Sequence, residues 1–422
     1  HTLIIGLARK EAAIMLTNEE IRRQAELQRD YVVACRRTIH RFAEVSGTEF
    51  KTSAFIEGEI KKTDLPYEKA GDTGWIAILD TGKPGPRIAL RADIDALPVP
   101  EEPNNLVGPR VVISDDPHTS HACGHDAHCA MLLGSMRALV ANRDKLNGII
   151  YFCFEEGEEN GKGIPFMLNQ LKEHGVDVVW GIHVYAGLSS GKICVSSGPR
   201  MAGAAGVNIT VIGKGGHGSR PDMAANPVFC AAAILTNVAT AWVNQISAGK
   251  TVTLGVTSIR GGETGNVIPD TASMIGSLRF FDDVEGKKAV NVFKSVAEHT
   301  AAMNNCHVEF GKDFQVLCAP VINDKYYSDL ISAALPEVLP EGFQVSPCEP
   351  WYASEAFSRY REICPSVFAH LGINNPTYGS GAAHHNGFFD VDENVMPTGL
   401  IATMKFVDTV ETDTQNTTKG GI

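Results

Sequence analysis

The stretch TSHACGHDAHCAMLLG, residues 119–134, limits most strongly what this chain can fold into and do. Its eight residues from His121 to His128 hold a thiol, three imidazoles and a carboxylate. Gly124 separates Cys123 from His125, and a glycine lets the backbone turn both side chains toward one point. The apolar residues that follow recur at helical spacing, so we expect a buried helix with these side chains at its start. Thiolate and neutral imidazole favour zinc-like ions, whereas a buried cysteine and hydrogen-bonded histidines without metal are the alternative.

Composition limits the classes of partner. A formal charge of −12 and a pI near 5.6 argue against nucleic acid or an anionic membrane as partner, because either needs a basic patch. We find no apolar run that approaches the roughly 20 residues of a membrane span. The ten cysteines are scattered without a CxxC pair, which favours reduced thiols in a cytoplasm over a disulfide framework. Residues 1–14 lack an initiating Met, and we expect them to lie outside the fold.

A chain of 422 residues exceeds the size at which one hydrophobic core usually stops growing, so we expect two domains. Strands and helices alternate up to about residue 202, which indicates an α/β layer with sites at the C-terminal ends of its strands. The pattern then changes to β-α-β-β-α-β, typical of a small ferredoxin-like α+β sheet. We therefore predict an α/β domain with a mixed sheet (15–202 and 319–422), interrupted by a smaller α+β lid (203–318).

Two adjacent carboxylates, Glu158 and Glu159, follow the apolar strand predicted at 147–154. One of them can coordinate a metal while its neighbour takes a proton from water. A solvated acidic turn is the alternative. His183 lies in the next predicted strand, where an imidazole is unfavourable unless its nitrogens have partners. A metal supplies one, and a hydrogen-bonded core histidine remains the other interpretation.

Other polar residues are weaker candidates. Asp93 could orient a ligand imidazole, or it could be an ordinary polar residue at a strand end, like Asp95. His384 and His385 are adjacent near the C-terminus, and because adjacent side chains diverge we expect one of them at most to face a metal. The insert contributes three more polar residues, each of which could equally be surface structure: His217, Asn266 and Arg279.

In combination and order, these stretches make the chain resemble the M20 family of metallopeptidases. The motifs are RRTIHRFAE, LRADIDALP, HACGHDAH, the EE pair, GIHV, GKGGHGSRP, NVIPD, SEAF and HHNGFFDVDE. They extend over nearly the whole chain and point to the amidohydrolase branch, which includes N-acyl-amino-acid, aminobenzoyl-glutamate and auxin-conjugate hydrolases. Two departures are FEEGEE in place of FQPAEE, which adds Glu155 and Glu156 beside the metal loop, and the extra imidazole of His384.

The resemblance implies a centre of two divalent metal ions, with zinc expected first and manganese, cobalt or nickel as alternatives. Glu158 would be the general base, and His217 would stabilise the oxyanion in a partner subunit's site. Asn266 and Arg279 would bind substrate, and Arg279 is suited to clamp a free carboxylate. Asp93 would support the ligands from behind. The implied ligands are Cys123 (as the bridge), His125, Glu159, His183 and His385.

The implied activity is metal-dependent hydrolysis of the amide bond of N-acyl or N-aroyl amino acids that carry a free carboxylate. The implied assembly is a homodimer formed through the lid. A dipeptidase or aminopeptidase of the same family is the alternative enzyme. A non-catalytic dimeric binding protein that keeps the fold is the alternative from another class, although a pure binder has no need of Glu158 as a base.

Overall fold

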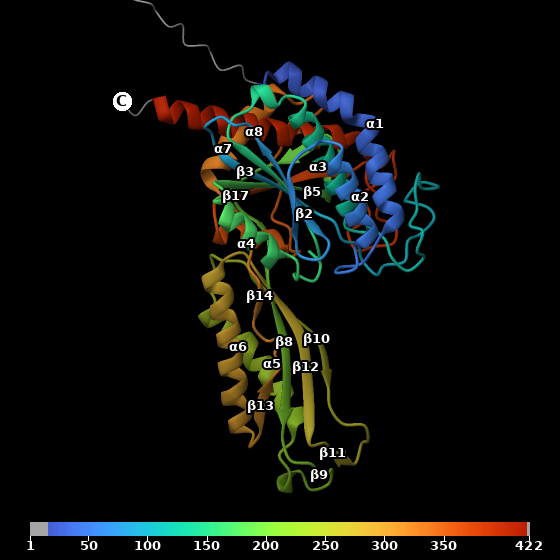
Figure 1. Ribbon diagram of the computed structural model, residues 1–422. Helices are drawn as coiled ribbons and strands as arrows, with labels where there is room; N and C mark the ends of the chain where they lie inside the picture. The colour runs from blue at the N-terminus through green and yellow to red at the C-terminus, as the bar shows by residue number, and fades with distance from the viewer. Residues whose placement is uncertain (1–15, 420–422) are drawn as a thin grey trace, which may run out of the picture. The chain divides into compact units, whose positions relative to one another are not determined.

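The computed structural model describes residues 16–419, so the expectation for residues 1–14 lies outside the described residues. Contacts divide the chain into two compact units (Figure 1). Unit 1 comprises the chain up to Ser196, Asp324–Cys348 and the chain from Glu362 onward. Unit 2 comprises Ser197–Asn323 and Glu349–Arg361.

Unit 1 is built on an eight-stranded mixed sheet with the strand order β1-β2-β4-β3-β5-β17-β6-β16. The four central strands β4, β3, β5 and β17 run parallel, and they are almost wholly buried because helices cover them. The strands are β1 (Tyr67–Ala70), β2 (Gly74–Asp80), β3 (Arg87–Asp93), β4 (Ile149–Glu155), β5 (Val178–Ser189), β6 (Lys192–Cys194), β16 (Gln344–Val345) and β17 (Ser366–Asn374).

The helices of unit 1 pack around this sheet. Helix α3 lies against β3 and β5, and α1 and α8 pack on α3 (Figure 1). Helix α1 begins with a capping box formed by Thr17 and Glu20. The helices are α1 (Asn18–Phe42), α2 (Phe50–Lys61), α3 (His125–Val140), α4 (Ile164–His174), α7 (Lys325–Ala334) and α8 (Met396–Lys419), with 3₁₀ turns at Arg143–Lys145, Leu335–Glu337 and Glu393–Val395.

Unit 2 is an antiparallel sheet of order β10-β12-β8-β13, with β14 also paired to β8. Side chains of β8 alternate between buried and half-buried, because α5 and α6 pack on one face of the sheet. The main elements are β8 (Gly203–Ile212), α5 (Pro227–Gln245), β10 (Val252–Arg260), β12 (Thr271–Phe280), α6 (Asp283–Met303), β13 (His307–Phe310) and β14 (Val316–Cys318). Two short ribbons, β9 (Gly216–His217) with β11 (Val267–Ile268) and β7 (Gly198–Met201) with β15 (Val321–Asn323), and 3₁₀ turns at Pro221–Met223 and Ala356–Glu362 complete the unit. The predicted fold class, an α/β unit with a mixed sheet and a ferredoxin-like α+β insert, is confirmed.

One segment lies in a different unit from the one its sequence position suggests. Residues 349–361 belong to unit 2, although they follow the predicted insert by thirty residues. The peptide N–H of Ala202 donates to the carbonyls of Trp351 and Ala353, and the N–H of Trp351 donates to Arg200. These backbone bonds join distant parts of the chain, so periodicity along the sequence gives no sign of them.

Helix α5 is an exception to the expectation that no apolar run of the chain approaches the length of a membrane span. Among the described residues this helix alone is long and apolar enough to cross a membrane, with a mean hydropathy of 1.4 over its most apolar window. Its inward face is part of the core of unit 2, through Cys230, Ala231, Ile234 and Val238. The apolar composition of α5 therefore comes from one face that packs in the core of unit 2 and from exposed apolar residues on the opposite face.

Candidate metal centre

The loop before α3 turns its thiol and first imidazole to the same side. Gly124 has φ +92°, in the left-handed region, and a Cβ on this residue would lie 2.4 Å from a methyl group of Val184. Only glycine fits this backbone without strain. Cys123 precedes it, and His125 is the first residue of α3.

The register of the parallel strands brings the next candidate to this loop. Arg91 of β3 pairs with Gly181 of β5, which places His183 beside the end of β3. The Nδ1 atom of His183 lies 2.6 Å from the carbonyl oxygen of Val184, so Nδ1 carries the proton and Nε2 has a lone pair. That Nε2 lies 3.6 Å from Sγ of Cys123. Burial lowers the pKa of His183, which keeps the ring neutral and suited to bind a metal.

His125 shows the clearest sign of a missing partner. Its Nδ1 lies 3.0 Å from Oδ1 of Asp95, and this contact leaves Nε2 as the atom that a metal would bind. Nε2 is buried and has no hydrogen-bond partner among the described residues, and the same is true of Oε1 of Glu159, 3.9 Å away. A cation bound between these two buried atoms would give both of them a partner.

Glu159 and His385 complete the set of five. Nε2 of His385 lies 3.2 Å from Oε1 of Glu159. The peptide N–H of His385 donates to the carbonyl of Ala122, which ties the C-terminal loop to the Cys123 loop. His385 has φ +61°, an uncommon conformation for a residue with a side chain, here held by that bond.

Three groups of possible ligand atoms overlap at this point, each with its atoms within 4.8 Å of one another. Cys123 joins His125 and His183 in one group, and joins Glu159 and His385 in a second. Shared membership suits a thiolate that bridges two ions. Glu158 forms a third group with His125 and Glu159, which places the proposed base beside the proposed ligands. The donor set therefore fits two soft to borderline divalent ions.

A fourth group, Asp93 with His125 and His128, does not suit a metal. Nδ1 of His128 lies 2.6 Å from Asp93, and its Nε2 accepts the peptide N–H of Val184 at 2.8 Å. Both ring nitrogens are thus used, so His128 is a hydrogen-bonded core histidine. The carboxylate that orients His125 is Asp95, whereas Asp93 pairs with His128 and Arg91.

The extra imidazole of His384 lies behind the thiol. It is close to Cys123, with Nδ1 3.7 Å from Sγ, and its Nε2 accepts the N–H of Ala186 at 3.1 Å. Its ring packs at 4.7 Å on Phe389. The two histidines therefore diverge as expected, and His385 is the one grouped with Glu159.

The two acidic residues that FEEGEE adds, Glu155 and Glu156, do not place uncompensated negative charge beside the centre. Glu155 is buried and paired with Arg91 at 2.5 Å. Oε2 of Glu156 accepts from the peptide N–H of Gly74 at 2.9 Å, and also from the N–H and hydroxyl of Thr73. Cationic and peptide donors offset both charges, so the solvated-turn interpretation fails for these two residues.

The three candidates of the insert lie in unit 2. His217 and Asn266 are neighbours in the β9–β11 ribbon, where the N–H of Gly218 donates to the carbonyl of Asn266. Nδ1 of His217 accepts the N–H of Ser219 at 3.1 Å, which leaves Nε2–H as a donor. Arg279 lies near the other end of β12, eight residues from Thr271, a span of about 26 Å along a strand. Unit 2 does not bring Arg279 together with His217 and Asn266.

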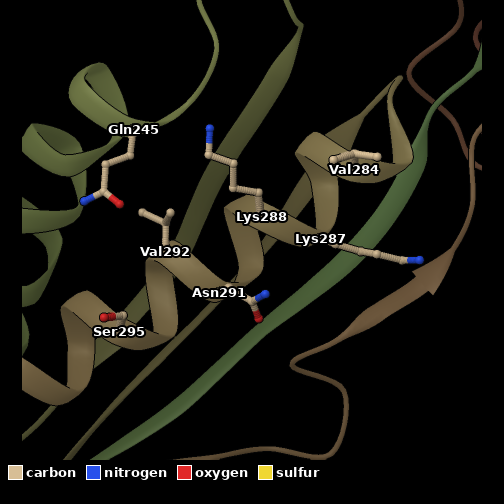
Figure 2. A pocket seen from close by; sticks show the side chains of 7 residues that line it. All are labelled: Gln245, Val284, Lys287, Lys288, Asn291, Val292 and Ser295. Atoms are coloured by element: carbon tan, nitrogen blue, oxygen red, sulfur yellow. The ribbon is translucent and has the colours of Figure 1, made fainter.

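A surface hollow of about 520 Å³ between α5 and α6 has a different character. Figure 2 shows Lys287 and Lys288 leaving α6 in different directions, with Gln245 of α5 across from Lys288. Among the described residues that line it there is no histidine, cysteine or carboxylate. This hollow lacks the groups that hydrolysis of an amide needs.

Comparison with known proteins agrees with this centre. A sequence model of peptidase family M20/M25/M40 matches residues 89–409. The chain is 31% identical over 390 residues to thermostable carboxypeptidase 1 of Saccharolobus solfataricus (91% of this chain, 96% of the relative). It is 32% identical over 370 residues to N-acetylcysteine deacetylase of Bacillus subtilis (86% of this chain, 93% of the relative). A solved dinuclear metal-binding peptidase of the M20 family from Bacillus subtilis superposes with a TM-score of 0.78 at 27% identity, over 92% of this chain and 99% of that one. The chain belongs to peptidase family M20/M25/M40.

Proposed function

We propose that this protein is a two-metal amidohydrolase that cleaves the amide bond of N-acyl or N-aroyl amino acids. The observation that carries the proposal is the convergence of Cys123, His125 and Glu159 with further imidazoles, beside the second carboxylate of Glu158. The deacetylase and the carboxypeptidase among its relatives both release an amino acid from an acyl group, by their names. Cys123 favours zinc, with manganese, cobalt and nickel as alternatives.

The chain's own residues divide the chemistry. Bound divalent ions polarise a carbonyl and lower the pKa of water. Glu158 takes the proton of the attacking water and passes it to the leaving amine nitrogen. The Nε2–H of His217 donates to the oxygen on which negative charge develops, and Asn266 supports the substrate beside it. Arg279, whose guanidinium donates to the carbonyl of Leu278, clamps the free carboxylate of the amino acid.

We propose that unit 1 is the catalytic domain and unit 2 the lid and dimerisation domain of a homodimer. The outward face of α5 supports this, because Phe229 is 72% and Val243 is 85% exposed, with Ala232, Thr236 and Ala239 between them. Strand β10 is an edge strand of the sheet in unit 2, and the backbone groups along its outer side have no strand partner among the described residues. A second copy covers both features. With ten cysteines and no disulfide, a reducing cytoplasm suits the protein, and its acidic charge supports neither a nucleic acid nor a membrane partner.

The test is a substrate panel with the metal-loaded protein. The panel holds N-acetyl and N-benzoyl amino acids, dipeptides with a free α-amine, and N-acyl amines without a carboxylate, and the measurement is release of the amine. We expect turnover of N-acyl amino acids and none of the amines that lack a carboxylate. Turnover of dipeptides alone would indicate the dipeptidase alternative. With metal verified bound, no turnover at all would leave a binding protein.

Glu158→Gln removes the base while keeping the shape of the side chain. We expect kcat to fall about 10²- to 10⁴-fold with metal content unchanged. Glu173→Gln on the exposed face of α4 is the matched control and should behave as the wild type. A Glu158→Gln protein that keeps full activity would contradict the assignment of the base.

A further inference from the structure

A buried carboxyl from a distant segment holds the loop that carries Glu158 and Glu159. Glu49 precedes α2 and is fully buried. Its Oε1 accepts the peptide N–H of Gly157 at 2.9 Å. Gly157 has φ +59°, so the chain turns sharply here, directly before the two carboxylates.

The other oxygen of Glu49 meets a hydroxyl that it must share. Oγ1 of Thr73 lies 2.9 Å from Oε2 of Glu49 and 2.8 Å from Oε2 of Glu156. A hydroxyl has one hydrogen, so it can donate to only one of these oxygens. The other contact is a hydrogen bond only if that carboxyl itself carries a proton and donates to Oγ1.

The surroundings decide which carboxyl is protonated. Oε2 of Glu156 also accepts the peptide N–H groups of Thr73 and Gly74, so this oxygen acts as an acceptor and has no place to donate to Thr73. Burial raises the pKa of Glu49 and outweighs the peptide N–H groups of Gly47 and Glu49, which lower it, and the nearby charge of Asp95 adds to the rise. The consistent arrangement is that Glu49 donates to Thr73, Thr73 donates to Glu156, and Gly157 donates to Glu49.

We propose that Glu49 is a positioning residue, kept as a neutral carboxylic acid, that fixes the Glu158–Glu159 loop through the peptide N–H of Gly157. Asp95 gives the loop its second anchor, since its Oδ2 accepts the N–H of Glu159 at 3.0 Å. These two anchored peptide N–H groups, of Gly157 and of Glu159, determine the directions of both carboxylates. The role of the loop in catalysis rests on the proposed function. The protonation of Glu49 rests on its hydrogen bonds and its burial, and does not depend on that function.

Substitution by glutamine separates the neutral acid from an ionised one. In Glu49→Gln the amide oxygen accepts from Gly157 and the amide N–H₂ donates to Thr73, which reproduces the bonds of the neutral acid. We expect this variant to keep wild-type kcat. Glu49→Ala removes both bonds, and we expect kcat to fall about 10- to 100-fold, because the carboxylates of the loop are displaced. Its KM and metal content should change little. Glu57→Gln on α2, paired with Lys61 on the surface, is the matched control.

Infrared spectroscopy tests the protonation without any substrate. The wild-type protein minus Glu49→Gln should show the C=O stretching band of a protonated carboxyl. Burial raises the pKa of Glu411 to about 8, so below that pH the band of this carboxyl is present in the absorption spectra of both proteins and cancels in the difference.

The outcomes are distinct. If Glu49→Gln loses as much kcat as Glu49→Ala, or if the difference spectrum has no protonated carboxyl band, the proposal is overturned. A Glu49→Ala protein with wild-type kcat overturns the proposal as well. Should Glu49→Ala fail to fold, the glutamine variant and the spectrum still decide. If no amide is hydrolysed by the wild type, the proposed function fails while the spectrum continues to test Glu49.

Discussion

At the scale of single residues, the proposed centre depends on carboxylates that are not metal ligands themselves but orient the side chains that are. Both carboxylate oxygens of Asp95 accept hydrogen bonds in this role. Its Oδ1 accepts from His125, and its Oδ2 accepts from the peptide N–H of Glu159 and from the hydroxyl of Ser46 at 2.6 Å. One side chain therefore sets the directions of two proposed ligands at once.

Asp95→Asn should weaken metal binding more than it weakens folding. An amide has one acceptor oxygen in place of two, so either His125 or the Glu159 backbone loses its partner. We expect metal affinity to fall about 10- to 100-fold, as is typical when a partner of a metal ligand is replaced. Competition with a chromogenic chelator measures it, with the exposed Asp72→Asn as control. Unchanged affinity would show that Asp95 does not orient the ligands.

The residues that the sequence reveals are those whose chemistry is unusual where they stand. Cys123 and His125 flank a glycine, and Glu158 and Glu159 follow a core strand, so local pattern suffices. The roles of Asp95 and Glu49 depend on partners 30 to 108 positions away. Asp93 and Asp95 look alike in the sequence, and only their hydrogen bonds separate a support for His128 from a support for His125.

At the scale of elements, a buried ionic cluster joins α1 to the start of α3. Arg36 lies 3.0 Å from Asp126 and also pairs with Asp390 and Glu393. His40 lies between Asp126 and Glu101, at 2.7 and 2.9 Å. Asp126 directly follows His125, so this cluster fixes the end of α3 that carries the proposed ligand.

The stability of unit 1 should depend on pH through His40. Burial alone lowers the pKa of His40, but its bonds to Asp126 and Glu101 outweigh this and raise the pKa to about 9, from 6.5 in an open chain. The folded form binds the proton more tightly, so the stabilisation is complete below pH 6.5 and is lost as pH rises through 9. We expect this stabilisation to be on the order of 3 kcal/mol, since one pKa unit corresponds to about 1.4 kcal/mol.

Thermal melts from pH 6 to pH 10 measure this effect by comparing the wild type with His40→Gln. The difference in Tm should be largest at the acid end and should shrink toward pH 10. His118→Gln, on the exposed loop, is the control. A Tm difference that is constant across this range would show that His40 stays neutral.

Patterns along the chain predict the elements well where one face is buried. The apolar strand predicted at 147–154 corresponds to β4, which spans Ile149–Glu155. Strand β5 runs on past His183 to Ser189, because β17 pairs with it there. Segment 349–361 has no periodic pattern, and backbone bonds to a remote strand determine its place.

At the scale of the whole molecule, the layout of unit 2 bears on the proposed dimer. His217 and Asn266 lie in a ribbon at one end, and Arg279 lies about 26 Å along β12. One copy of unit 2 therefore cannot place all three side chains around one small substrate. Two copies can, if Arg279 serves one site while the ribbon of the partner serves the same site.

Mixed dimers test this division directly. Glu158→Gln and His217→Ala should each be nearly inactive as pure proteins. In a mixed dimer, the His217→Ala subunit keeps its Glu158 and receives an intact His217 from the Glu158→Gln subunit. One of its two sites is then complete, so random mixing in equal amounts should restore about a quarter of wild-type activity. Co-expression with two different tags isolates the mixed dimers for assay.

The control pair is Glu158→Gln with Cys123→Ala, because both residues belong to unit 1 and no mixture of them completes a site. Light scattering must show that both pairs form dimers. Phe229→Glu with Val243→Glu on the outward face of α5 should give monomers that bind metal but do not turn over substrate, since each lacks the partner's ribbon. No recovery in the Glu158→Gln and His217→Ala pair, or full activity in a monomer, would place His217 in the site of its own chain and remove the need for a second copy.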